Sequence, residues 1–110
     1  MMMKIPKSVR IAGIEYTVID GVESLNDGFQ MLMGQIDYLE SEIRISDRAP
    51  SHQMKCVTLW HEILHGIQFN NGMEIENEEQ VIEMFARGIY QVLQDNGKRL
   101  FDNRGDTHAS

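Results

Sequence analysis

Apolar and polar residues alternate along the first half of the chain, as they do in strands with one buried face. Between residues 8 and 20 the apolar positions recur on both sides of Ala12-Gly13, at Val9 and Ile11 and then at Ile14, Tyr16 and Val18. Two alternating runs with a tight turn between them predict a hairpin or a kinked strand. Residues 21–28 are rich in Gly, Asn and Asp and predict a loop.

The alternation returns between residues 29 and 46. Apolar residues alternate at Ile36 and Tyr38 within residues 34–38 and at Ile43 and Ile45 within residues 42–46, and Leu39-Glu40-Ser41 separates the two runs. This spacing predicts the two arms of a second hairpin. An antiparallel sheet of three to four strands is therefore expected before the first helix.

Apolar positions then change to helical spacing. Ser51 is a good N-cap residue for a helix over 52–69, and Asn70-Asn71-Gly72 can end it in the left-handed conformation. The core side of this helix is expected at Val57, Trp60, Leu64 and Ile67, flanked by Cys56 and Ile63.

A second helix is expected to begin after Asn77, which forms a capping-box pattern with Gln80. Its apolar stripe consists of Ile82, Phe85, Ala86, Ile89 and Leu93. Asp95-Asn96-Gly97 is expected to end it, and the polar residues 97–110 are expected to form a flexible tail. The sequence thus predicts one α+β domain over residues 1–96, a small sheet followed by two packed helices.

The first helix contains H-E-x-x-H, formed by His61, Glu62 and His65. Residues four apart share a helix face, so both imidazoles can reach one metal ion, with the Glu62 carboxylate beside them as a general base. This is the arrangement of zinc peptidases. The alternative, an exposed helix with two histidines by chance, fits poorly because Trp60 and Ile63 make this helix half-buried.

Composition narrows the class of protein. The formal charge is −7, from 10 basic and 17 acidic residues, which disfavours nucleic acid as a partner. Cys56 is the single cysteine, so no disulfide forms within the chain, and it is expected to be a buried apolar residue. No apolar run reaches the about 18 residues of a membrane span, and residues 1–7 do not form a signal peptide. A soluble cytoplasmic protein is expected.

Strands that lead into His61–His65, followed by a helix with Glu83-Met84-Phe85-Ala86, resemble the small ImmA/IrrE-type metallopeptidase-like proteins of phages and prophages. The resemblance covers residues 4–96 and extends to Lys4-Ile5-Pro6-Lys7, Gly34–Asp37 and Ile89–Asn96. The resemblance implies a minimal gluzincin-like fold, a bound zinc ion and the hydrolysis of peptide bonds. The chain differs from larger members at Arg87, where Asn is usual, and no appended DNA-binding domain is expected.

The third metal ligand is expected from the second helix. The turn between the two helices is expected at residues 70–76. If the helices run antiparallel around it, the midpoint of His61 and His65 lies roughly 10 Å back along the first helix, and Glu83 lies roughly 9 Å along the second. Glu83 is therefore the preferred ligand and Glu79, about 3 Å along, is the second choice. The alternative role for Glu83 is a solvated ion pair with Arg87 at i+4.

Three functions are consistent with such a site. A zinc peptidase would act on a phage or host protein, with residues 34–38 as an edge strand for the substrate and Tyr38 or Tyr90 as a second electrophile. Packing is the favoured role for both tyrosines. A catalytically silent module would bind a regulatory protein, and a structural zinc would only join two helices. The sequence indicates neither the substrate nor the oligomeric state.

Overall fold

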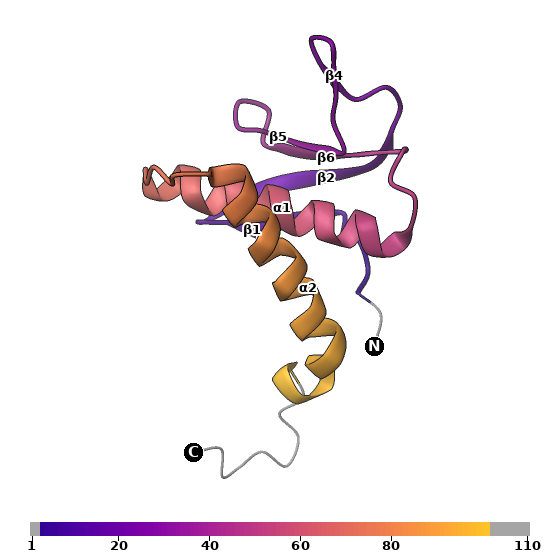
Figure 1. Ribbon diagram of the computed structural model, residues 1–110, viewed down its shortest axis with the longest axis vertical. Helices are drawn as coiled ribbons and strands as arrows, with labels where there is room; N and C mark the ends of the chain where they lie inside the picture. The colour runs from indigo at the N-terminus through magenta and orange to yellow at the C-terminus, as the bar shows by residue number, and fades with distance from the viewer. Residues whose placement is uncertain (1–2, 102–110) are drawn as a thin grey trace.

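Six short strands precede two long helices within residues 3–101, the part of the chain that the computed structural model describes (Figure 1). The strands are β1 (Ser8–Ile11), β2 (Ile14–Val22), β3 (Asn26–Asp27), β4 (Gln30–Met31), β5 (Gly34–Asp37) and β6 (Glu42–Ser46). The helices are α1 (His52–Asn71) and α2 (Glu78–Phe101). The α+β class that the sequence predicts is confirmed, and no helix within these residues is long and apolar enough to cross a membrane.

Both predicted hairpins are present. β1 pairs with β2 in antiparallel fashion around Ala12 and Gly13, whose φ angles of 51° and 82° suit the tight turn. β5 pairs antiparallel with β6. Residues 21–28, which were expected to form a loop, contain the end of β2 and the whole of β3. Strand β3 pairs with β4 in a second, two-stranded sheet.

The prediction of an antiparallel sheet is wrong at its centre. The main sheet has the order β1-β2-β6-β5, and β2 and β6 run parallel. Alternating residues identify strands, and a short turn identifies a hairpin, but neither shows how the two hairpins join. Here the second hairpin places β6 beside β2 and leaves β5 at the edge of the sheet.

Helix α1 lies between the sheet and α2, which explains why apolar residues occur on two of its sides (Figure 1). Leu59 packs with the buried residues of the sheet, among them Ile43 and Ile45. Cys56 and Val57 pack on the other side against α2. Ser51 caps the helix as predicted, because its side chain accepts a hydrogen bond from the Met54 N–H, and Gly72 ends it with φ of 62°.

Two predicted core residues are exposed. Ile67 is 44% exposed and Phe85 is 52% exposed, whereas Leu59, which the single-stripe pattern omitted, is 1% exposed. Helix α1, which carries Leu59 and Ile67, is packed on two sides and has no single apolar face, so periodicity alone misplaced its core. Phe85 lies on α2, about 100° around that helix from the buried Ala86. Cys56 is fully buried, as predicted.

Helix α2 begins as expected and ends later. Asn77 precedes it with φ of 57°, not the extended conformation of an N-cap, and its carbonyl accepts the Val81 N–H. The predicted end at Asp95–Gly97 is wrong, because Gly97 is helical and buried and the Asn96 side chain donates to the Val92 carbonyl. Residues 97–101 of the predicted tail are therefore helix, and residues 102–110 lie outside the described part of the chain.

Candidate metal centre

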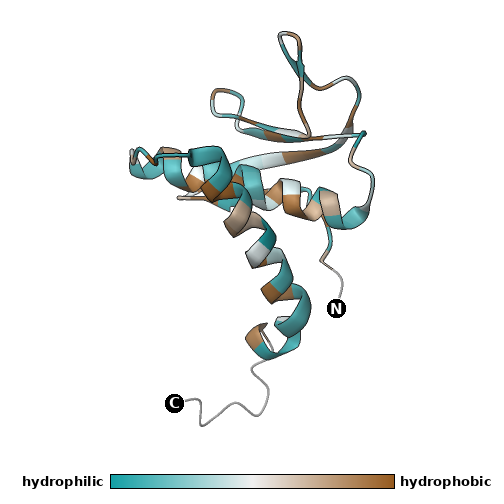
Figure 2. Ribbon diagram, viewed as in Figure 1, coloured by the Kyte–Doolittle hydropathy of each residue, from teal (hydrophilic) through white to brown (hydrophobic). Residues whose placement is uncertain are grey.

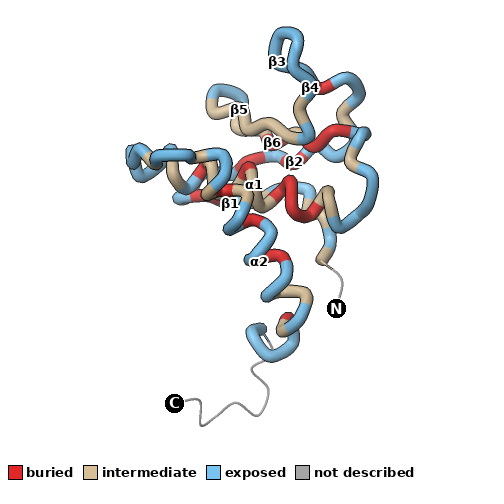
Figure 3. The backbone as a smooth tube through the Cα atoms, in the orientation of Figure 1, coloured by how far each residue is buried: buried red, intermediate tan, exposed pale blue. Residues whose placement is uncertain are grey.

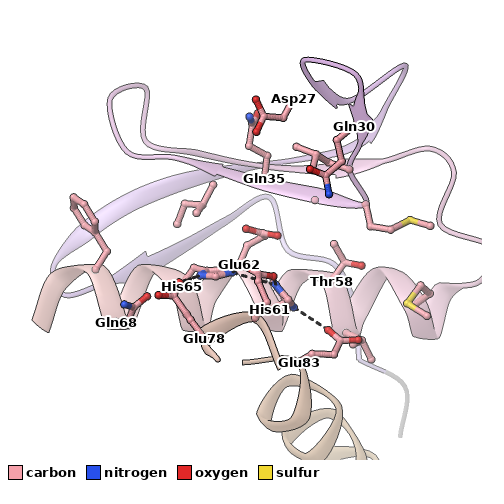
Figure 4. Close-up of a pocket in the computed structure, with 18 of the residues that line it drawn as sticks. Asp27, Gln30, Gln35, Thr58, His61, Glu62, His65, Gln68, Glu78 and Glu83 are labelled. Carbon is pink, nitrogen blue, oxygen red and sulfur yellow. Dashed lines mark hydrogen bonds and ion pairs between the residues drawn. The ribbon is translucent and has the colours of Figure 1, made fainter. Parts of the chain in front are cut away.

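The two histidines of the motif converge as the helical spacing predicts. His61 and His65 lie one turn apart on α1, with side chains that are 17% and 14% exposed. Their Nε2 atoms are 3.1 Å apart and their ring centroids are 4.8 Å apart. Two imidazole nitrogens therefore point at one position between α1 and the start of α2 (Figure 4).

Glu79 completes this group. Its Oε1 lies 2.9 Å from His65 Nε2, and its Oε2 lies 3.1 Å from His61 Nε2. In a tetrahedral zinc site with bonds of about 2.0–2.1 Å, neighbouring ligand atoms lie about 3.3 Å apart. The three side chains thus fit a two-nitrogen, one-oxygen metal site and form a group that could hold a metal ion.

Two other carboxylates contact the opposite ring nitrogens. Glu83 Oε1 lies 2.8 Å from Nδ1 of His61, and Glu78 Oε2 lies 3.1 Å from Nδ1 of His65. Metal-bound histidines commonly donate their second N–H to a carboxylate, which fixes the tautomer and the ring orientation. Glu83 also forms an ion pair with Arg87 over 2.8 Å, the i+4 contact considered from the sequence.

These contacts revise the preference for Glu83 as the third ligand. The sequence placed Glu83 level with the midpoint of the two histidines, but Glu83 contacts His61 alone. Glu79, which the sequence placed nearer the turn, contacts both of them. The register does not show which ring nitrogen a carboxylate reaches, since the rotamers decide this. Glu79, one turn earlier, faces the Nε2 atoms, while Glu83 faces Nδ1.

Glu62 lies on the sheet side of the histidines, in a cleft beneath the sheet edge (Figure 4). The cleft has a volume of about 990 Å³ and is lined by α1, β5, the β3–β4 hairpin and the first turns of α2. Glu62 is only 7% exposed. Burial is the main cause that raises the pKa of its carboxyl to about 7. The charge of His61 lowers this pKa, and the charge of Glu79 raises it further. A carboxyl with this pKa can accept and release protons near neutral pH.

Strand β5 lies very close to α1 at this point. A Cβ on Gly34 would lie 2.5 Å from Thr58 Cγ2 and 3.0 Å from Glu62 Oε2. Only glycine allows this approach without a shift of the backbone or of Thr58. Gly34 thus brings the edge strand to the wall of the cleft.

The two tyrosines considered as electrophiles differ in position. Tyr90 is buried in the cluster with Cys56, Val57 and Ala86, so packing is its role. Tyr38 lines the cleft and stacks on Phe69 with ring centroids 3.8 Å apart. Burial, followed by the charges of nearby groups such as Glu62, raises the pKa of Tyr38 to about 12.

Sequence reasoning missed three residues of the site. It did not place Glu78 or Thr58, which is buried, at the site, and it considered Gly34 only as part of the edge strand. The run Glu78-Glu79 followed by Glu83 was the available signal for several carboxylates near one metal. No signal was available for the Gly34–Thr58 contact, because it joins residues 24 apart in the chain.

Comparisons of the chain with protein-family models, with curated proteins and with solved structures found no match.

Proposed function

We propose that this protein is a zinc-dependent metallopeptidase-like protein of the ImmA/IrrE type that cleaves peptide bonds. The observation that carries the proposal is the position of Glu62. A buried carboxylate with a pKa of about 7 shares one cleft with a cluster of two imidazoles and a carboxylate. A purely structural metal site has no use for such a group.

His61, His65 and Glu79 would hold the zinc ion. Their two nitrogens and one oxygen match the donor set of catalytic zinc sites, which keep one position open for substrate or water. Zinc supplies Lewis-acid chemistry there, since it polarises a carbonyl and makes water acidic enough to lose a proton near neutral pH. Glu83 and Glu78 would hold the two rings through their Nδ1 atoms.

Glu62 is the proton carrier in this proposal. It accepts a proton from the water that attacks the peptide carbonyl and then delivers that proton to the leaving amine. Its burial keeps bulk water away from the carboxyl and raises its proton affinity. Tyr38 lines the cleft and would be the tyrosine that contacts a substrate there.

Strand β5 would align the substrate. It is the edge strand of the main sheet and its residues line the cleft. An extended peptide can add to such an edge through main-chain hydrogen bonds. Gly34 and Gln35 would then place the scissile bond beside Glu62.

A Glu62→Gln variant tests the proposal. The purified protein should contain about one zinc per chain by elemental analysis. Glu62→Gln should keep this zinc and lose cleavage of unfolded protein substrates and peptide libraries, because the amide cannot carry the proton. Loss of zinc from this variant would contradict the assigned roles.

Zinc without cleavage would instead favour the silent binding module. Such a result, obtained with wild-type protein across a broad peptide library, would leave the metal assignment intact and refute the proposed hydrolysis. Absence of zinc from protein purified without chelator would refute both.

A further inference from the structure

Helix α2 carries a second apolar surface that is separate from its contact with α1. Six residues line a shallow groove of about 450 Å³ on this surface: Met84, Phe85, Gly88, Ile89, Val92 and Leu93. Met84 is 60% exposed, Phe85 52% and Val92 51%. The lower part of α2 extends away from the sheet, and Figures 2 and 3 show hydrophobic and exposed residues along it.

This apolar stripe, defined by the six groove residues, faces away from the core. At about 100° per residue, Phe85, Gly88 and Val92 fall on one side of the helix. The buried residues Ala86 and Tyr90 fall more than about 90° away from the centre of that side, and the buried Ile82 falls near its edge, about 80° away. Within the described residues the centre of the stripe, at Phe85, Gly88 and Val92, is therefore exposed and free for a partner, while Ile89 and Leu93 at its edge are half-buried.

The stripe is complementary to itself when two copies of α2 run antiparallel. If the two-fold axis passes between Gly88 and Ile89, Phe85 of one copy meets Val92 of the partner subunit. The same axis matches Met84 with Leu93 and Gly88 with Ile89, which accounts for all six groove residues. We propose that the stripe binds a second copy of this chain, with α2 packed antiparallel on the partner's α2 across a two-fold axis.

The charges at the ends of α2 support this occupant and this direction. Its first turn carries Glu78 and Glu79, and its last turn carries Lys98 and Arg99. The same axis places the basic last turn of one helix opposite the acidic first turn of the partner's helix, in which Glu78 and Glu79 also contact the histidines of α1. A parallel pair would instead place acid against acid and base against base.

Gly88 lies at the centre of the proposed contact. A Cβ built there meets nothing within 4 Å, so the helix has an open surface at this point. Small residues at a helix crossing allow the two backbones to approach closely. The larger side chains of Phe85 and Val92 can then pack on either side of the crossing.

Sedimentation equilibrium from micromolar to submillimolar concentration tests the self-association. The full chain should show a reversible monomer–dimer equilibrium. Val92→Glu should raise the dimer dissociation constant at least about tenfold, because two buried valines per dimer become charged. Leu39→Glu is the matched control, since Leu39 is 97% exposed and lies outside α2, and it should leave the constant unchanged. Circular dichroism checks that both variants are folded.

Spin labels test the direction of the helices. A label on Lys98→Cys, in a Cys56→Ala background, should give an intermolecular distance of at least about 28 Å, the axial separation in the antiparallel pair. A parallel pair would give about 10 Å. A short distance, a monomer at all concentrations, or a dimer that Val92→Glu does not weaken would each overturn the proposal.

Discussion

Gly34 of β5 and Thr58 of α1 lie so close together that a methyl group on Gly34 would sit 2.5 Å from Thr58 Cγ2. The same methyl would lie 3.0 Å from the Glu62 carboxylate. This contact sets the distance between the edge strand and the helix that carries the motif. It thereby joins the fold of the sheet to the position of the group proposed to move protons.

We predict that Gly34→Ala destabilises the protein by about 1–3 kcal/mol, because an added methyl in a close-packed contact forces its neighbours to move. Urea denaturation measures the change. Thr58→Ser removes the Cγ2 methyl that the new Cβ would strike, so Gly34→Ala should cost less in that background. Equal costs in both backgrounds would show that Thr58 is not the obstacle.

The two acidic residues of α2 should differ in their effect on zinc affinity. Glu79→Gln removes a proposed ligand and should weaken zinc binding more than Glu83→Gln, which removes a proposed orienting partner and should cost about 10–100-fold. Competition with a chromophoric chelator measures both constants. Glu76→Gln, an exposed acid outside the cluster, is the control. The reverse order of effects would return Glu83 to the role of third ligand.

Removal of either histidine should lower the melting temperature in the presence of zinc. Metal binding in a small domain adds to the free energy of unfolding, and His61→Ala or His65→Ala deletes one of three proposed ligands. Differential scanning calorimetry with and without chelator measures the effect. Wild-type protein should lose thermal stability on chelation, while both variants should be nearly insensitive to it. A wild-type melting curve that chelator does not change would argue against a bound metal.

Glu62 should make the metal-free protein less stable as the pH rises. Its pKa is about 7 in the folded state and near 4.5 in the unfolded chain, so the folded state binds the proton more tightly. The contribution of Glu62 to the free energy of unfolding is fully present below about pH 4.5, declines as the pH rises, and is lost above about pH 7. The total loss is about 3 kcal/mol. Glu62→Gln should lack this part of the pH dependence. The difference between the two urea-denaturation profiles in chelator measures it, and parallel profiles would contradict the buried, neutral carboxyl.

The sequence alone determined the local elements and the two histidines of the candidate metal site. Alternation and turn residues located both main hairpins, and Ser51 and Gly72 marked the ends of α1. The i, i+4 spacing of His61 and His65 brought their Nε2 atoms together, because a helix fixes the positions of residues one turn apart. These features depend on short-range geometry, which the order of residues specifies directly.

The tertiary structure decided the features that join distant residues. The parallel pairing of β2 with β6, the choice of Glu79 over Glu83 at the Nε2 atoms, and the contact of Gly34 with Thr58 each depend on how separate elements pack. Packing also covered α1 on two sides and left the apolar stripe of α2 uncovered, although both helices carry helical periodicity. Periodicity shows that a face is apolar, but only the packed structure shows which face is buried within the chain and which remains exposed.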